Sequence, residues 1–401
     1  MIAPGVAFED LAEQHLAALI AEEASEGRRL DFKEALPGTS DADKREFLAD
    51  VSSFANAGGG DLLFGMGESD SGAARALVPL EFNPDAELLR LEQLISTSVS
   101  PRIPGVRMRE IPLSRGLALL IRIPASWDAP HAVTHQGTQR FYSRNSRGKF
   151  QLDVGELRNA FLASSGVATA LRNFRTERLG RIAASGDPIS TEVAGKIVLH
   201  LVPYGALTTQ QTFDPNVIRG SGLFRPGFEA AGGDERWNID GLLTYSLNRE
   251  QNAAWSYTQL FRNGCLEAVD AFRLRPLADQ PGALVPQPAT HGHSLEALIL
   301  RGTANHVEVL KRIGVEPPIV VFVSLLGVEN LAITTGDVTA DAGGIWRRID
   351  RDTVLLPEVL LESEDANTPN AMRPIADALW QASGWNWSSN YNAEGNWVPR
   401  A

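Results

Sequence analysis

Hydrophobic positions near the start of the chain follow first a helical and then a strand spacing. From Glu9 to Glu23 one stripe at helical spacing contains Leu11, His15, Leu16, Leu19 and Ile20, which predicts an amphipathic helix. Over residues 28–33 apolar and polar residues alternate instead, as is typical of a half-buried strand. Since side chains alternate across a strand, we expect Asp31 and Lys33 to share one face.

The next apolar stripe predicts a helix over residues 44–57 that begins after Asp43 and faces a core. Gly58, Gly59 and Gly60 follow it, and a strand is expected over residues 61–66. Three glycines in a row can also cradle a phosphate group. A helix end that leads into a strand explains them better, because glycine favours the turn that closes a helix.

The remaining pattern mixes helices and strands and predicts an α+β fold. We expect helices over residues 85–98, 154–162, 168–184 and 294–313, and strands over 106–112, 116–123, 139–144, 196–202, 240–246 and 318–326. Asp153 and Glu156 have the spacing of a capping box. Asn263-Gly264 predicts the turn of a hairpin formed by residues 256–261 and 265–272. The predicted division is a first domain over 1–165, a basic connecting helix and linker over 166–188, and a second α+β domain over 189–401.

Composition excludes several classes of protein. The 401 residues contain one cysteine, which rules out an intramolecular disulfide and a multi-cysteine zinc or iron–sulfur site. The apolar runs are much shorter than the roughly 20 residues that cross a bilayer, and the first residues do not resemble a secretory signal. We therefore expect a cytoplasmic protein that does not span a membrane.

The net charge of −12 conceals an uneven distribution along the chain. Residues 1–101 contain 7 Lys and Arg against 19 Asp and Glu, residues 102–181 contain 14 against 5, and residues 182–401 contain 16 against 25. Partners respond to local fields and not to the sum over a chain. The middle segment is therefore basic enough to attract nucleic acid.

Three residues near the first strand have the chemistry that phosphodiester cleavage requires. Glu26 precedes the strand, and Asp31 and Lys33 lie within it. Two carboxylates can hold a divalent cation, and a lysine can stabilise the negative charge that develops on phosphate. A solvated charged strand face gives the same pattern, so these residues alone do not identify a function.

Four short motifs occur in a fixed order. They are EGRRLDFK from Glu26 to Lys33, FANAGGG over 54–60, LLFGM over 62–66 and RFYSRNS over 140–146. Their order and spacing resemble those of the Schlafen-like, AlbA-type domain, in which the matching elements are E-x4-(E/D)-F-K, FANT-x-GG, L-x-IGV-D-D and Tyr-x-Arg. The resemblance covers about residues 10–165.

The resemblance implies a nucleic-acid-binding fold and, by analogy with Schlafen members, an endoribonuclease that acts on structured RNA such as tRNA. It also implies three acids that bind Mn2+ or Mg2+. Glu26 and Asp31 match two of them, and Glu68 is the expected third, with Asp70 as the alternative. Glu68 can equally be an exposed loop acid. The candidate catalytic residues are thus Glu26, Asp31, Lys33 and Glu68.

A basic cluster with aromatic residues is the expected nucleic-acid-binding surface, because phosphate contacts by Arg and Lys supply most of the affinity. Its residues are Arg140, Tyr142, Arg144, Arg147 and Lys149, with Lys44 and Arg45 as further candidates. Arg144 and Arg147 rank first. The alternative is that the aromatic residues belong to the core and that the arginines form a solvated strand edge.

Two other functional hypotheses remain open. A DNA-binding transcriptional regulator would use the same basic surface without cleavage, and a protein-interaction hub would show neither property. Animal Schlafens resemble a clamp of two lobes, so we expect this single lobe to form a homodimer. The second domain has no catalytic motif, and the resemblance to bacterial defence effectors suggests a sensor or regulatory domain, such as one that detects phage infection and restrains the nuclease.

Overall fold

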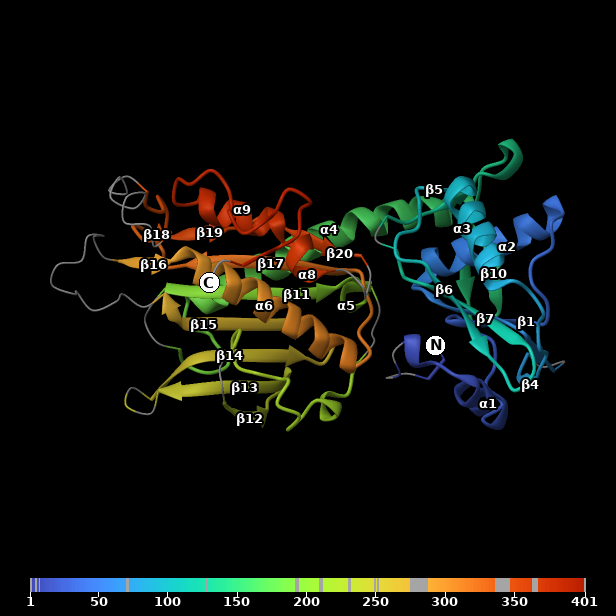
Figure 1. Cartoon of the computed structure of the whole chain (residues 1–401), viewed down its shortest axis with the longest axis horizontal. Coiled ribbons are helices and arrows are strands. Elements are labelled where there is room, and N and C mark those ends of the chain that lie inside the picture. Colours follow the sequence, from blue (N-terminus) through green and yellow to red (C-terminus); the bar gives the residue numbers. More distant parts are fainter. Residues whose placement is uncertain are drawn as a thin grey trace. The chain divides into compact units, whose positions relative to one another are not determined.

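The computed structural model separates into two compact units. The first contains residues 1–170, 207–209 and 316–318, and the second contains the remainder. The structure describes residues 2–3, 6, 8–69, 72–126, 128–191, 195–208, 212–229, 232–248, 250, 252–274, 288–335, 347–362 and 367–399. Helices and strands are interspersed in both units, as expected for an α+β protein (Figure 1).

The first unit is built on a four-stranded sheet in the order β1-β2-β7-β6. Its strands are β1 (Leu30–Lys33), β2 (Gly60–Phe64), β7 (Leu117–Ile123) and β6 (Arg107–Pro112). β1 and β2 are parallel, whereas the other two pairings are antiparallel. Beside the sheet are η1 (Phe8–Asp10), α1 (Glu13–Ala21), and a small hairpin of β3 (Met66–Glu68) and β4 (Ala74–Leu77).

A second, antiparallel sheet has the order β10-β9-β8-β5. It contains β5 (Val99–Ser100), β8 (Ala132–Val133), β9 (Arg140–Asn145) and β10 (Gly148–Gln151). Helix α2 (Asp41–Ala57) packs on β8, β9 and β10, and α3 (Pro84–Ser98) packs on α2 and β6. The short turn η2 (His135–Gly137) joins β8 to β9.

Helix α2 begins and ends where polar and glycine residues satisfy its backbone. The Ser40 hydroxyl accepts from the Asp43 amide, so the cap lies three residues before the predicted one. Gly58 closes the helix at φ 123°. A side chain at Gly60 would lie 2.5 Å from the ring of Phe54, so the glycine run allows close packing between α2 and β2 and ends the helix as predicted.

Helix α4 (Val154–Ala183) is a single helix where the pattern predicted two. Asp153 and Glu156 form the expected capping box, since each backbone amide donates to the other side chain. The helix begins in the first unit and continues into the second from Leu171. It therefore connects the two units covalently without an intervening loop.

The second unit is built on an eight-stranded sheet in which β12, β13, β14, β15, β11, β17 and β19 follow one another and β20 pairs with β17. Its elements are β11 (Gly195–Pro203), α5 (Tyr204–Thr208), η3 (Pro215–Val217), β12 (Asp234–Trp237), β13 (Gly241–Asn248), β14 (Ala253–Phe261), β15 (Leu266–Leu274), β16 (Ala289–His291), α6 (Gly292–Arg312), β17 (Ile319–Leu326), β18 (Ala332–Thr334), β19 (Thr353–Leu355), β20 (Val359–Leu361), α8 (Thr368–Ala371) and α9 (Arg373–Gln381). β14 and β15 form the predicted antiparallel hairpin.

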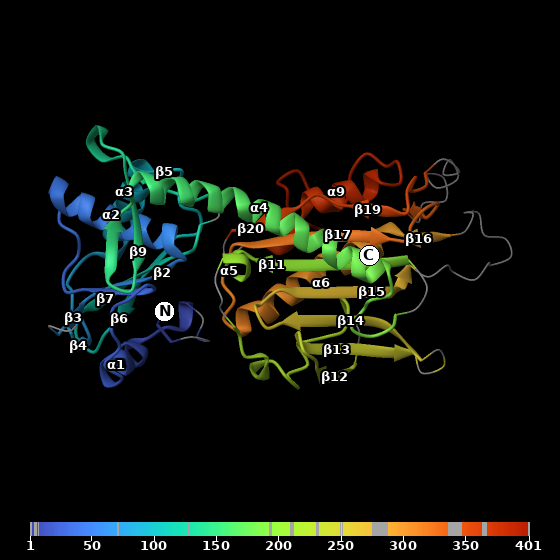
Figure 2. The same ribbon diagram turned by 180° about the vertical axis from the view of Figure 1, so that it is seen from behind.

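Helices cover both faces of this sheet. The core on one face includes residues of α6 and α9, such as Leu298 and Leu379. The smaller core on the opposite face contains Leu179 and Ile182 of α4, which crosses the sheet in Figure 2. The second half of α4 thereby belongs to the core of the second unit.

Buried charges also attach α4 to the sheet. Arg178 donates two hydrogen bonds to the Glu267 carboxylate, at 2.8 and 2.7 Å. His200 and Tyr257 complete the shell around that carboxylate at 2.9 Å each. Arg175 donates to the carbonyl oxygens of Val323 and Leu356. These two arginines of the predicted basic connecting helix therefore bind within the unit.

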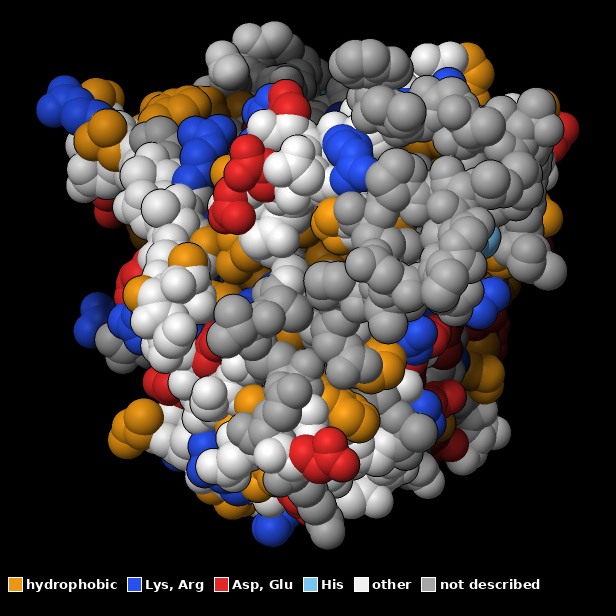
Figure 3. Space-filling view, turned by 90° about the vertical axis from the view of Figure 1, so that its left-hand side faces the viewer, with side chains coloured by type: hydrophobic (Ala, Val, Ile, Leu, Met, Phe, Trp, Pro, Cys, Tyr) orange, Lys and Arg blue, Asp and Glu red, His pale blue; other side chains and the backbone are white. Residues whose placement is uncertain are grey.

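None of the described helices is long and apolar enough to cross a membrane. On the face shown in Figure 3, basic, acidic and hydrophobic side chains are interspersed among the described residues. The described residues of this face therefore form no uniformly basic surface.

Candidate nucleic-acid-processing site

Strand β1 brings Glu26, Asp31 and Lys33 together. The Lys33 ammonium lies 2.8 Å from one carboxylate oxygen of Asp31, as their shared strand face predicts. The Phe32 amide donates to the Glu26 carboxyl at 2.6 Å, and Glu26 is also hydrogen-bonded to Asp31. Glu26 is partly exposed and Asp31 is buried. The three side chains therefore form one contact cluster with its acidic centre covered.

Arg144 of β9 binds Asp31 from the opposite side. Its Nη2 atom donates to the second carboxylate oxygen at 2.6 Å, and its Nε atom donates to the Gly27 carbonyl. The guanidinium also lies 4.1 Å from the ring centre of Phe54. Because the Arg144 side chain is 2% exposed, it holds Asp31 in place and does not reach the surface.

Asp50 extends the cluster and was missed by sequence reasoning. It is buried on α2, where its carboxylate lies 2.9 Å from the Lys149 ammonium and 3.9 Å from Arg144. Lys149 also pairs with Glu46, and it stands opposite Arg144 in the β9–β10 register. A charged residue between Phe47 and Phe54 on an apolar helix stripe was the signal that could have revealed it.

The Glu26 and Asp31 carboxyls differ strongly in acidity. Burial and the hydrogen bond with Asp31 raise the pKa of Glu26 to about 8. Burial opposes ionisation of Asp31 too, but its hydrogen bond with Glu26 and the charges of Arg144 and Lys33 outweigh it and lower the pKa of Asp31. The pair therefore carries one proton at neutral pH, on the Glu26 side.

The pKa values of the surrounding groups respond to the same charges. Burial raises the pKa of Asp50, and the Lys149 ammonium opposes that rise. Burial favours neutral Lys33, but Asp50 and Asp31 outweigh it and raise the pKa of Lys33. The lysine therefore remains a cation across the neutral range, beside a carboxyl pair that can release a proton.

Asn56 fixes the second sheet against α2. Its side-chain amide donates to the carbonyl oxygens of His131 and Tyr142 and accepts from the His131 amide. This explains the asparagine in the FAN motif, because it joins α2 to β8 and β9. The contact positions β9, and with it Arg144, beside β1.

The expected nucleic-acid-binding residues separate into exposed and supporting groups. Arg140, Arg147 and Arg45 are exposed, and Lys44 and Lys149 are half-buried. Tyr142 is half-buried and packs against the core of α2 and the first sheet, which favours the core alternative for this aromatic residue. Arg144 is buried, and its guanidinium is turned inward to the acidic cluster.

The carboxylates of this cluster are the type of ligand that a divalent cation prefers. Mg2+ in proteins is often held by one or two carboxylates together with phosphate oxygens of the substrate. Glu26 and Asp31 supply two adjacent carboxylates, which suits that mode once their shared proton has left. Glu68 lies exposed at the end of β3, and Asp70 is outside the described residues. Within the described part of the chain, no three His, Cys, Asp or Glu side chains are grouped to hold a metal ion.

Comparison with known proteins identifies the N-terminal region. Residues 26–153 match the family model described as Schlafen, AlbA_2. The DIP2311 protein of Corynebacterium diphtheriae is 20% identical over 35% of this chain and 27% of its own, with a TM-score of 0.24. The N-terminal domain of an ATP-dependent DNA helicase RecG-related protein from Nitrosomonas europaea is 21% identical over 35% of this chain and 93% of its own, with a TM-score of 0.26. No curated protein matches. The chain spans about a quarter of the Corynebacterium protein.

Proposed function

Because residues 26–153 match the Schlafen, AlbA_2 family model, we propose that this region binds RNA and cleaves it as an endoribonuclease with Mn2+ or Mg2+ as cofactor. The observation that carries the proposal is the Glu26–Asp31 carboxyl pair beside the Lys33 ammonium. Acids that can hold a cation and a lysine that can neutralise phosphate occur together there, at the edge of a cluster whose other side is buried.

Each residue has a distinct task in this proposal. Glu26 and Asp31 hold the cation, which supplies charge neutralisation at the scissile phosphate. Lys33 stabilises the negative charge that develops on the phosphate oxygens. Arg144 is a positioning residue, since it is buried and touches only Asp31 and its surroundings. Asp50 and Glu46 hold Lys149, whose side chain is 21% exposed.

Exposed cations around β9 extend the binding surface. Arg140 and Arg147 are exposed at either end of the β9 segment, and Arg45 lies at the start of α2. Such residues bind the backbone of any sequence, so selection of structured RNA such as tRNA would depend on shape. We place tRNA first among substrates, and a role against phage is a further proposal, because both follow from the family resemblance.

The test is a cleavage experiment with end-labelled tRNA, ribosomal RNA, single-stranded DNA and duplex DNA. We expect cleavage of tRNA with Mn2+ or Mg2+, no cleavage in EDTA, and loss of cleavage in the Glu26→Gln and Asp31→Asn variants. Glu22→Gln, which alters an exposed acid at the end of α1, is the matched control. Cleavage that survives both site substitutions would refute this assignment of the site.

One observation favours a second candidate, a DNA-binding regulator without cleavage. Both oxygens of Asp31 are already bound, by Lys33 and Arg144, which is how a structural ion pair is arranged. This candidate predicts salt-sensitive duplex DNA binding and no cleavage of any substrate with either cation. The same four substrates therefore distinguish the two candidates.

We also propose that the chain forms a homodimer. The first half of α4 carries apolar side chains that are largely exposed, with Val154 at 77%, Phe161 at 53% and Leu162 at 63%. Burial of such a face against a second copy would be favourable. Sedimentation that detects only monomer, or a dimer that Phe161→Glu leaves intact, would contradict this arrangement.

A further inference from the structure

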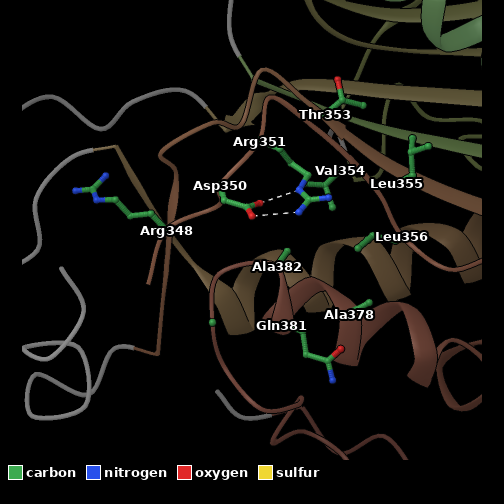
Figure 4. A pocket seen from close by; sticks show the side chains of 11 residues that line it. Arg348, Asp350, Arg351, Thr353, Val354, Leu355, Leu356, Ala378, Gln381 and Ala382 are labelled. Carbon is green, nitrogen blue, oxygen red and sulfur yellow. Dashed lines mark hydrogen bonds and ion pairs between the residues drawn. The ribbon is translucent and has the colours of Figure 1, made fainter. Parts of the chain in front are cut away.

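A groove in the second unit lies beside the edge strand β19. It has a volume of about 610 Å3 and is lined on one side by Thr353, Val354 and Leu355 of β19 and on the other by residues of α9 and the turn after it. Figure 4 shows Ala378 and Ala382 on the α9 side of the Asp350–Arg351 pair, with the Gln381 side chain directed away from that pair. A strand and a helix thus form its two walls.

β19 is the last strand of its sheet. It pairs with β17 on one side, and no strand among the described residues pairs with the other. Leu355 is 57% exposed and Thr353 is exposed as well. Edge strands usually carry charged or proline residues that prevent pairing with other chains, and the three residues of β19 include neither.

The register shows which backbone groups face the groove side. The Leu356 amide donates to Val323, and the Asp352 carbonyl accepts from Val328, so both point toward β17. Along an antiparallel strand, successive residues direct their backbone groups to opposite sides. Thr353 and Leu355 therefore direct their amide and carbonyl groups away from β17, where an added strand would pair.

The charged side chains that line the groove are Arg348, Arg351 and Asp350, a balance that favours an acidic partner. Arg351 binds Asp350 through two contacts, at 2.7 and 3.1 Å, and both side chains are about two-thirds exposed. Such an exposed pair is weak and can exchange its carboxylate for another. Arg348 adds a second cation at the rim, where its side chain extends away from the α9 residues in Figure 4.

We propose that this groove binds an extended acidic peptide segment of another protein, which adds to the outer edge of β19 as a strand. The outward amide and carbonyl groups of Thr353 and Leu355 would form the ladder, and a Glu or Asp side chain of the peptide would replace Asp350 as the partner of Arg351. The groove volume lies in the range of known ligand sites. The second unit then receives a protein signal through a surface separate from the Glu26 cluster.

The test uses the full chain and a fluorescein-labelled hexapeptide of alternating glutamate and valine, with a lysine–valine hexapeptide for comparison. We expect the glutamate peptide to bind more tightly than the lysine peptide in fluorescence anisotropy. Arg351→Glu should weaken binding by about fivefold or more, because it turns an attraction into a repulsion. Asp350→Asn should strengthen it, since it removes the competing carboxylate.

Leu355→Pro tests the strand pairing itself. The proline removes only an amide that points away from β17, so the sheet should keep its own ladder while peptide binding is lost. Circular dichroism and thermal unfolding check that this variant folds. The proposal is overturned if neither peptide binds at about 1 mM, which corresponds to a binding free energy near −4 kcal/mol. It is also overturned if Arg351→Glu and Asp350→Asn shift the affinity in the same direction, or if folded Leu355→Pro binds normally.

Discussion

The Arg144 guanidinium donates to the Asp31 carboxylate over 2.6 Å, with exposed fractions of 2% and 3% for the two side chains. A buried carboxylate without a partner would be protonated or destabilising, so this contact keeps Asp31 ionised inside the domain. The second oxygen of Asp31 accepts from the Lys33 ammonium, and the Asp31 carboxylate is also hydrogen-bonded to the partly exposed Glu26. In the proposed site, Arg144 would therefore act through Asp31.

Arg144→Ala should destabilise the first unit by about 3–5 kcal/mol, because it leaves a buried carboxylate without its counterion. Urea unfolding followed by circular dichroism measures the loss. Arg147→Ala, which removes an exposed arginine from the same hairpin, should change stability by less than about 0.5 kcal/mol. Addition of Asp31→Asn to Arg144→Ala should recover part of the loss, and a double variant that is as unstable as the sum of both changes would contradict the pairing.

The stability of the first unit should fall as pH rises through about 8. The pKa of Glu26 is raised in the folded state, so its contribution is fully present below the unfolded pKa and is lost as the folded carboxyl ionises. Between pH 7 and 9 the wild type should lose about 1 kcal/mol relative to Glu26→Gln, after allowance for the partial exposure of Glu26. Parallel pH profiles of unfolding for the two proteins would show that Glu26 is not protonated at neutral pH.

Nucleic-acid binding should depend on the exposed cations near β9. Arg147→Ala and Arg140→Ala should each weaken binding to tRNA, by a similar factor whatever the nucleotide sequence. Each substitution should also reduce the slope of log affinity against log salt concentration by about 1. The matched control is Arg115→Ala, an exposed arginine between β6 and β7. Filter-binding measurements of tRNA affinity at several salt concentrations, from low to moderate, give these slopes. Equal effects of all three substitutions would indicate a diffuse field and not a defined surface.

In the second unit, Arg178→Ala should cost about 3–5 kcal/mol, because Glu267 would remain buried beside only His200 and Tyr257. Glu267 is fully buried, and despite that burial Arg178 and His200 lower its pKa to about 2. Arg172→Ala, on the exposed side of the same helix, is the control and should be nearly neutral. Differential scanning calorimetry should show the transition of the second unit shifted in the first variant alone.

The sequence predicted the elements that carry the site better than it predicted their contacts. The spacing of Asp31 and Lys33 predicted one shared strand face, and in the structure their side chains lie 2.8 Å apart. The apolar stripe of α2 was predicted correctly, but the helix is capped by Ser40 and not by Asp43. The Ser40 hydroxyl accepts a hydrogen bond from the otherwise free Asp43 amide. The local sequence pattern therefore predicts the positions of helices and strands to within a few residues.

The local sequence pattern did not predict contacts between residues that lie far apart in the chain. Arg144 lies 113 residues after Asp31, and only the packing of the second sheet on α2 shows that its side chain turns inward. A basic cluster in the sequence does not separate arginines that bind phosphate from arginines that neutralise a buried acid. Asp50 was hidden for the same reason, since its partner Lys149 lies on β10.

The most direct test of the central claim is the pH and cation dependence of tRNA cleavage by the wild type and Glu26→Gln. We expect wild-type cleavage to require Mn2+ or Mg2+ and to increase as pH rises toward about 8, where Glu26 loses its proton and becomes a ligand, and Glu26→Gln to be inactive at every pH. Cleavage in EDTA, or equal rates for the wild type and Glu26→Gln across this range, would contradict the account.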